Sequence, residues 1–262
     1  MRTAILLATA AALLAAARPA AADDCEVNGL DCIATRQFSA TADATSDALF
    51  ITALALPLGI ELGRGFDDDS ARRGIAWASA VGATALTAGA AKLVVRRDRP
   101  YTYNRHPGVV EYTAHAAGND HSFFSGHTSL AFASLTAGAL LYNPTSHDDT
   151  ARLGIWAGAG AIAATTGVLR IRAGQHFPTD VMVGAVVGTG FGLGLGWALA
   201  PAHDLRATDL AALGAGVAVG TAVGALLPMP SDVRLPLGVR SVAVAPTLAP
   251  GHAGLAVTGA LR

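Results

Sequence analysis

Three short polar stretches interrupt an otherwise apolar chain, and each carries residues that could hold an anion. Lys92 and Arg99 stand at the spacing K-x6-R-P in KLVVRRDRP, SFFSGHTS covers residues 122–129, and Arg170 begins the pattern R-x5-H-x3-D. Lys92, the only lysine in the chain, provides a compact positive charge. The guanidinium forks of Arg99 and Arg170 match phosphate oxygens. We therefore expect these stretches to form a phosphate site.

The second and third stretches add groups that could do chemistry at such a site. Ser125 and Gly126 open a predicted helix, where free backbone N–H groups favour an anion. His176 and Asp180 are four residues apart, so on a first helical turn the carboxylate can reach the ring, fix its tautomer and stabilise its charged form. His127 is a second imidazole, able to give a proton to a leaving group.

The acidic residues argue against a metal site. Magnesium prefers clustered carboxylates, and the polar gaps that carry the motifs offer only Asp98, Glu111, Asp120 and Asp180. Two histidines beside three cations favour phosphoryl transfer through a phosphohistidine instead. The loop 101–121 adds histidines whose spacing matches no metal template. We therefore predict no metal and no cofactor, and we expect this loop to cover the substrate.

Each stretch also has a purely structural explanation. The K-x6-R-P pattern could be ordinary charge at a membrane surface, Ser125 could simply cap a helix, and His176 could be a surface histidine. The combination of all three in one chain, with the only lysine in place, favours a catalytic site.

In this order the motifs K-x6-R-P, S-G-H and R-x5-H-x3-D resemble the type-2 phosphatidic acid phosphatase superfamily, which includes lipid phosphate phosphatases, bacterial acid phosphatases and vanadium haloperoxidases. The resemblance covers about residues 92–180. It implies a helical-bundle core and metal-independent hydrolysis of a phosphomonoester or diphosphate. It further implies His176 as nucleophile, His127 as general acid and Asp180 as the partner of His176. The phosphate ligands that it implies are Lys92, Arg99, Ser125, Gly126 and Arg170.

Two positions depart from the superfamily's pattern. Phe124 stands where a proline usually precedes Ser-Gly-His, and Leu169 stands where a serine usually precedes the arginine. Neither change removes a charged or nucleophilic group. A looser loop or a lost hydrogen bond would lower the rate, so we expect a weaker enzyme at most.

The composition indicates that membrane helices position these motifs. Of 262 residues, 52% are hydrophobic and 14% charged, against about 25% charged in soluble domains, and the mean hydropathy is +0.44. We predict an all-α, membrane-embedded bundle of about six helices, with a soluble Ala-rich bundle as the alternative. The net charge of −1 offers no basic surface for nucleic acid. The apolar runs lie at about 48–63, 74–95, 128–142, 153–169, 181–200 and 209–228.

The ends of the chain differ from its middle. The first residues combine Arg2, an apolar run and small residues before two aspartates, which is typical of a cleaved signal peptide. Alternating valines and alanines around P-G-H-A-G predict a β-hairpin-like tail. Export would also allow Cys25 and Cys32 to form a disulfide. The predicted divisions are signal peptide 1–22, polar segment 23–46, helical phosphatase domain 47–228 and tail 229–262.

Six spans after an exported N-terminus would place gaps 96–127 and 170–180 outside, so that all three motifs meet there. We therefore expect a phosphatase in a bacterial cell membrane, with its site facing the periplasm and a phosphorylated lipid or other phosphate ester as substrate. Within the same superfamily, the alternatives are a soluble periplasmic acid phosphatase or a haloperoxidase, and only the latter would use vanadate. The alternative from another class is a non-catalytic, anion-binding membrane protein.

Overall fold

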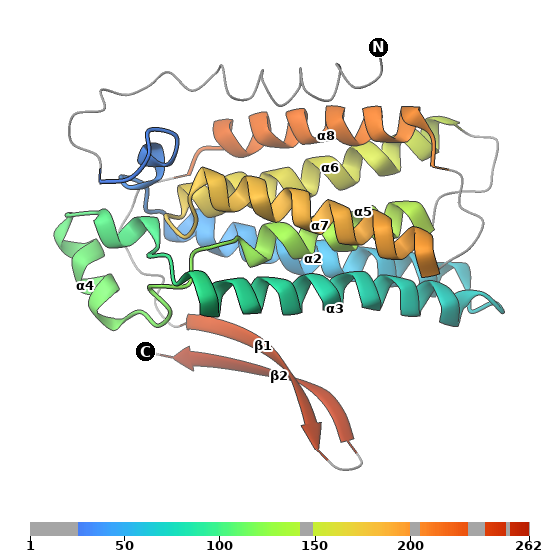
Figure 1. The fold of residues 1–262 in the computed structure, drawn as a ribbon, viewed down its shortest axis with the longest axis horizontal. Coiled ribbons are helices and arrows are strands. Elements are labelled where there is room, and N and C mark those ends of the chain that lie inside the picture. The colour runs from blue at the N-terminus through green and yellow to red at the C-terminus, as the bar shows by residue number, and fades with distance from the viewer. Residues whose placement is uncertain (1–25, 142–148, 200–204, 230–238, 250–251, 262) are drawn as a thin grey trace.

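The structure, a computed structural model, describes residues 26–141, 149–199, 205–229, 239–249 and 252–261 (Figure 1). The predicted signal peptide and Cys25 lie outside these ranges, while Cys32 is disulfide-bonded. The described elements are η2 (Asp31–Ala34), α2 (Ala40–Arg64), α3 (Ser70–Val95), η3 (Pro100–Tyr103), α4 (Pro107–His115), α5 (Gly126–Leu141), α6 (Asp149–Arg172), α7 (Pro178–Leu199), α8 (Ala207–Leu226), β1 (Val239–Ala249) and β2 (His252–Leu261).

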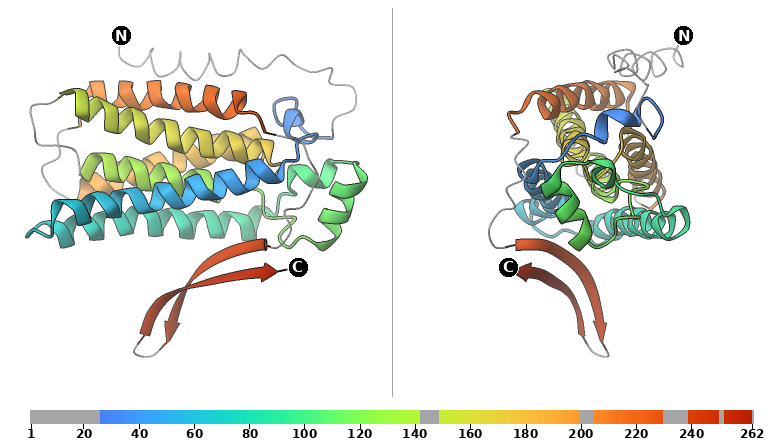
Figure 2. Two further views of the ribbon diagram at one scale, coloured as in Figure 1. Left: turned by 180° about the vertical axis from the view of Figure 1, so that it is seen from behind. Right: turned by 90° about the vertical axis from the view of Figure 1, so that its left-hand side faces the viewer.

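Helix α5 is the centre of the helical bundle. It contacts α2, α3, α6 and α7, while α8 packs on the outer side of α6 (Figures 1 and 2). Nearly every residue of α5 from Thr128 to Leu141 is buried. The core around it combines Phe132, Leu135 and Leu140 with Trp156 of α6. Short residues elsewhere, mostly alanine and glycine, let the helices lie close to one another.

Five helices are long and apolar enough to cross a membrane, which indicates a membrane protein. These are α2, α3, α6, α7 and α8, and α5 is not among them. In the described residues α5 has 16 residues, fewer than the ~20 that span a bilayer. The sequence predicts a sixth span here because residues 128–142 are apolar. Other helices enclose the described part of this run, and burial in protein and burial in lipid select the same residue types.

Glycines at four-residue spacing make the closest helix contacts possible. A Cβ atom at Gly188 of α7 would meet the carbonyl oxygen of Ser129 on α5, and a Cβ atom at Gly220 of α8 would meet that of Ala161 on α6. Both approaches are closer than any side chain allows. The glycine-rich run of α7 therefore serves to seat this helix directly on α5.

The end of the bundle that carries the α2–α3 turn holds its charges in pairs. Arg73 donates to Glu61 at 3.1 and 2.7 Å and to Asp67 at 2.8 Å. Arg152 of α6 donates its Nε to Asp209 of α8 at 2.7 Å and also forms a second bond to that carboxylate through Nη2. Each of these arginines is buried and meets at least one carboxylate.

Two segments differ from the sequence-based description. Helix α2 begins at Ala40, inside the stretch predicted as a polar segment. The predicted loop 101–121 contains η3 and α4, because Tyr101, Val109 and Tyr112 pack on Phe38 in a small core of their own. In the tail, β1 and β2 pair antiparallel, with Val244 opposite Val257.

Candidate active site

The three motifs meet at the end of the bundle where α4 and η2 lie (Figure 1). Lys92 lies in the last turn of α3, Gly126 begins α5, and Arg170 lies in the last turn of α6. His176 follows in the turn between α6 and α7, and Asp180 lies in the first turn of α7. Because neighbouring helices run in opposite directions, alternate helix ends bring residues far apart in sequence to one place.

A backbone carbonyl orients His176. The imidazole is buried, and its Nδ1 lies 2.7 Å from the carbonyl oxygen of Ser122. A carbonyl can only accept, so Nδ1 carries the proton and the lone pair of Nε2 is available. Burial lowers the pKa of His176 well below its ordinary value, and the charges of Lys92, Arg99 and Arg170 act in the same direction. The ring is therefore a neutral base near pH 7.

Asp180 acts on His176 through Ser122. Its Oδ2 lies 3.9 Å from Nδ1 of His176, which is beyond hydrogen-bond distance. The carboxylate instead accepts bonds from Ser122 Oγ at 2.6 Å, from Arg97 at 2.6 Å and from the backbone N–H of Phe177 at 2.9 Å. The direct contact between Asp180 and His176 expected from the sequence is thus replaced by a contact to the residue whose carbonyl holds the ring.

Arg97 connects this carboxylate to the N-terminal segment. Its guanidinium donates to Asp180 and, at 2.7 Å, to the fully buried Asp31 of η2, and it lies 4.0 Å from the centre of the Phe177 ring. Asp31 also accepts from the backbone and hydroxyl of Thr179. Arg97, Ser122 and Asp31 have no assigned role in the sequence motifs. The pair Arg96-Arg97 inside the first motif could have indicated a role for Arg97, but the motif K-x6-R-P specifies only Lys92 and Arg99.

In the described part of the chain, carbonyl oxygens hold Lys92 and Arg99. Lys92 donates to the backbone oxygen of His121 at 2.7 Å, and Arg99 donates to that of Gly118 at 3.0 Å and to the side-chain oxygen of Gln175. Among the described residues, no carboxylate lies within ion-pair distance of either cation. Their positive charges are therefore oriented but not neutralised, which is the arrangement that an anion site requires.

The start of α5 lies beside these cations. Ser125 is buried, and its Oγ lies 2.8 Å from the hydroxyl of Thr128 and accepts the backbone N–H of Thr128 at 3.4 Å, as a helix cap does. A Cβ atom at Gly126 would lie 3.9 Å from Cε of Lys92. The first N–H groups of a helix lack partners within it. Ser125 and Gly126 therefore offer backbone donors where the ammonium group already lies.

One face of α2 completes the site, although none of the three sequence motifs includes it. Arg170 donates to Asp43 at 2.6 Å, to Ser46 at 3.2 Å and to Asp47 at 3.1 Å. These residues follow the spacing of one helical face. Two carboxylates four residues apart, just before an apolar run, were the available signal. Their partner on α6 is more than 120 residues away in the chain.

His127 lies between α2 and the cations. Its Nε2 is 3.1 Å from Asp47, its ring centre is 4.5 Å from that of Phe50, and its side chain is 31% exposed. Burial lowers the pKa of His127 to about 4, and Arg170 acts in the same direction, whereas Asp47 opposes the shift. His127 therefore has a carboxylate partner of its own, which the family motifs do not contain.

The model of the PAP2 superfamily matches residues 73–202. Over this segment the chain belongs to the PAP2 superfamily. PAP2 proteins are phosphatases, which supports a phosphatase reaction for this chain. The matched segment contains all eight predicted site residues, whereas Asp31, Asp43 and Asp47 lie before it. No curated protein and no solved structure gave a match.

The additional histidines of the PAP2 segment do not gather into a metal site. Nδ1 of His115 lies 2.8 Å from the backbone oxygen of Glu111, and His121 lies 3.6 Å from Asp120. In the described ranges, no three residues among His, Cys, Asp and Glu are placed to hold a metal ion. The segment 101–121 instead supplies the backbone oxygens that orient Lys92 and Arg99.

Proposed function

We propose that this protein hydrolyses a phosphomonoester or diphosphate on a lipid, without a metal, through a phosphohistidine at His176. One observation carries the proposal: the oriented but unneutralised charges of Lys92 and Arg99 lie around a buried, neutral imidazole whose Nε2 is available. A phosphoryl group held by these cations presents its phosphorus to a nucleophile that needs no separate base.

In the first step, Nε2 of His176 attacks phosphorus, forming the P–N bond as the bond to the leaving oxygen breaks. His127 gives its proton to that oxygen, so the alcohol or phosphate leaves neutralised. His127 must first be protonated, and its pKa is low. The negative charge of a bound phosphate favours the imidazolium, so substrate binding raises this pKa and draws in the proton.

In the second step, His127 is the base. It accepts a proton from water, the resulting hydroxide attacks phosphorus, and the P–N bond breaks to release inorganic phosphate and neutral His176. Lys92, Arg99 and Arg170 balance the charge on the phosphoryl oxygens in both steps. The carbonyl of Ser122 keeps the proton on Nδ1 throughout, while Asp180 and Arg97 hold Ser122 in place.

The lipid substrate is supported by the position of the site. It lies at one end of helices that are long and apolar enough to cross a membrane, where lipid headgroups lie. The proposal that this end faces the periplasm rests on the signal peptide predicted for residues 1–22. Accessibility of an introduced cysteine in 101–121 to an impermeant reagent in intact spheroplasts tests that orientation; labelling only after lysis would contradict it.

The decisive experiment traps the intermediate. Purified protein is incubated in EDTA with a phosphatidic acid carrying labelled phosphate, quenched and digested. We expect acid-labile, base-stable label on the peptide that contains His176. Hydrolysis that stops in EDTA and returns with magnesium would contradict the metal-free reaction. Label on His127, or full hydrolysis by His176→Ala, would contradict the assignment, and the second result would favour an anion-binding protein.

A further inference from the structure

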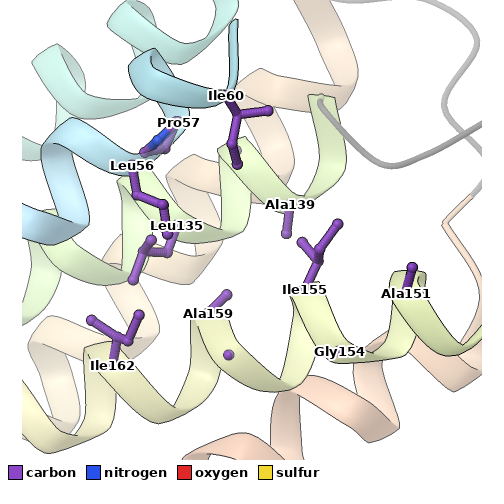
Figure 3. Close-up of a pocket in the computed structure, with 12 residues that line it drawn as sticks. Leu56, Pro57, Ile60, Leu135, Ala139, Ala151, Gly154, Ile155, Ala159 and Ile162 are labelled. Atoms are coloured by element: carbon purple, nitrogen blue, oxygen red, sulfur yellow. The ribbon is translucent and has the colours of Figure 1, made fainter. Parts of the chain in front are cut away.

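An apolar cavity of about 310 Å³ opens between α2, α5 and α6 (Figure 3). No charged side chain lines it, and its size is within the range of ligand sites. Figure 3 shows α2 and α6 on opposite sides of the space, with α5 behind it. The side chains that define it best are Leu56, Ile60, Leu135, Ala139, Ile155 and Ile162.

The cavity lies on the same helix faces as the candidate active site. On α2, Pro57 lines the cavity and follows Asp43 by 14 residues, or two heptads, a spacing that returns to the same helix face. On α6, Ile162 lines it and stands eight residues before Arg170. With a rise of 1.5 Å per residue, the cavity lies about 12 Å from the site along α6, and Pro57 lies about 21 Å from Asp43 along α2. The seam between α2 and α6 thus begins with the polar site and continues as the cavity.

The cavity also opens sideways, toward the outside of the bundle. Leu56 is 43% exposed at its edge, and Gly154 is exposed as well. Both α2 and α6 are candidate membrane spans, so this opening faces hydrocarbon in a bilayer. Near the site the two helices touch, because Leu49 packs against the cluster that contains Leu169. A ligand reaching the seam from the membrane would therefore enter at the level of the cavity.

We propose that the cavity holds a hydrocarbon chain of the phosphorylated lipid whose headgroup reacts at His176. This inference rests on the proposed function. Lipid tails are already in an apolar solvent, so moving one into the cavity gains little by leaving water. The gain is in position: a chain held between α2 and α6 fixes the headgroup at the level of Arg170. The enzyme then prefers long-chain substrates to short ones.

The glycines of α6 allow a direct test. Gly158 lines the cavity, and a Cβ atom there would meet nothing within 4 Å, so a side chain can start there without a clash and Gly158→Leu extends into the space. Gly82 of α3 is the matched control, because it is also partly buried in mid-helix with nothing within 4 Å of an added Cβ. The substrates are dioleoyl phosphatidic acid in mixed micelles and water-soluble p-nitrophenyl phosphate.

We expect Gly158→Leu to lower kcat/KM for dioleoyl phosphatidic acid about tenfold or more, the scale on which misfit of an apolar group is felt, and to leave p-nitrophenyl phosphate unchanged. Gly82→Leu should change neither value. Unchanged hydrolysis of the long-chain substrate by Gly158→Leu would overturn the proposal while the phosphatase function stood. So would an equal loss on both substrates.

A second measurement keeps the proposal testable if no hydrolysis is found. A phosphatidic acid with a diazirine in mid-chain is photolysed with the protein. We expect crosslinks on the peptides of α2, α5 and α6 that contain Leu56, Leu135 or Ile162, and their loss in Gly158→Leu. Such crosslinks without turnover would retain the lipid site and reject the phosphatase.

Other occupants give different results. Crosslinks spread evenly over α3 and α7, or displaced equally by phosphatidylcholine without a phosphomonoester, indicate bulk lipid and overturn the proposal. A protein–protein crosslink through the cavity residues indicates a second copy of the chain and also overturns it.

Discussion

The two ends of the helical bundle treat buried charge in opposite ways. At the end with Arg73 and Arg152, each guanidinium is matched by carboxylates, and the charges cancel locally. At the other end, Lys92 and Arg99 donate to carbonyl oxygens, and no described carboxylate lies within ion-pair distance of either. A pair that cancels can fasten two helices but presents no field to a ligand. Cations oriented by neutral oxygens keep their field and attract an anion.

Arg170 is intermediate between these two cases. It is buried like Arg152 and paired with Asp43 and Asp47, but both carboxylates are partly exposed and one of them also contacts His127. The two ends therefore differ in how far carboxylates neutralise the buried cations, with Arg170 between the extremes. Substitutions at each end can test this difference.

The largest effect is expected at the reactive atom. His176→Ala should abolish hydrolysis of every phosphate ester, because no P–N bond can form. His106→Ala is the matched control, since His106 is exposed at the same end and has no assigned role. Phosphate release and thermal unfolding in detergent are measured together. Turnover by His176→Ala with a normal unfolding temperature would show that the nucleophile is another group.

A pair of arginine substitutions compares the two ends directly. Arg99→Met should lower kcat/KM about 10²–10³-fold, as does removal of one oriented donor, and should not lower stability, because it leaves no carboxylate unpaired. Arg152→Met removes the guanidinium paired with the buried Asp209, so it should lower the free energy of unfolding by about 3–5 kcal/mol with kcat/KM intact. Reversal of this pattern would refute the distinction.

A smaller effect is expected at Asp180. Asp180→Asn should lower kcat about 10- to 100-fold, the usual scale for a residue that orients a site residue from behind. In a protease triad, where the carboxylate holds the histidine itself, the loss is ~10⁴-fold. Ser122→Ala removes the hydroxyl contact but keeps the carbonyl, so its loss should be no larger. A 10⁴-fold loss in Asp180→Asn would restore a direct role in fixing the tautomer.

The smallest predicted effect is a shift of the pH profile. His127 must be protonated to act, so kcat/KM should fall as pH rises above the pKa of His127 in the free enzyme, which burial lowers to about 4. Asp47 raises this pKa. Asp47→Asn should therefore move the basic limb of the profile to lower pH. Asp43→Asn, which leaves the contact to His127 in place, is the control. An unmoved limb in Asp47→Asn would contradict the pairing.

The sequence could predict those features that depend on residues close together in the chain. The spacing of Lys92 and Arg99, or of His176 and Asp180, is local, so the residue types alone indicate phosphate chemistry. The apolar runs likewise predict helices of membrane character. Five long helices match that expectation. The described part of α5 is shorter and is enclosed by protein, and a sequence alone does not separate residues buried by protein from residues buried by lipid.

Contacts between distant segments could not be predicted in this way. Asp180 meets Arg97 across 83 residues and Ser122 across 58, and no local pattern states which of several buried arginines a carboxylate will face. The role of Asp47 required knowing that α2 begins before the polar residues end. These contacts depend on how the helices are arranged around α5, which no single motif encodes.

Helix α2 lies before the segment that matches the PAP2 superfamily, yet it contacts His127 and also lines the apolar cavity. The proposed reaction chemistry and the proposed chain preference therefore depend on different stretches of this chain. If both proposals hold, substitutions along one face of this single helix would change the working pH and the preferred chain length with no change in any of the three motifs.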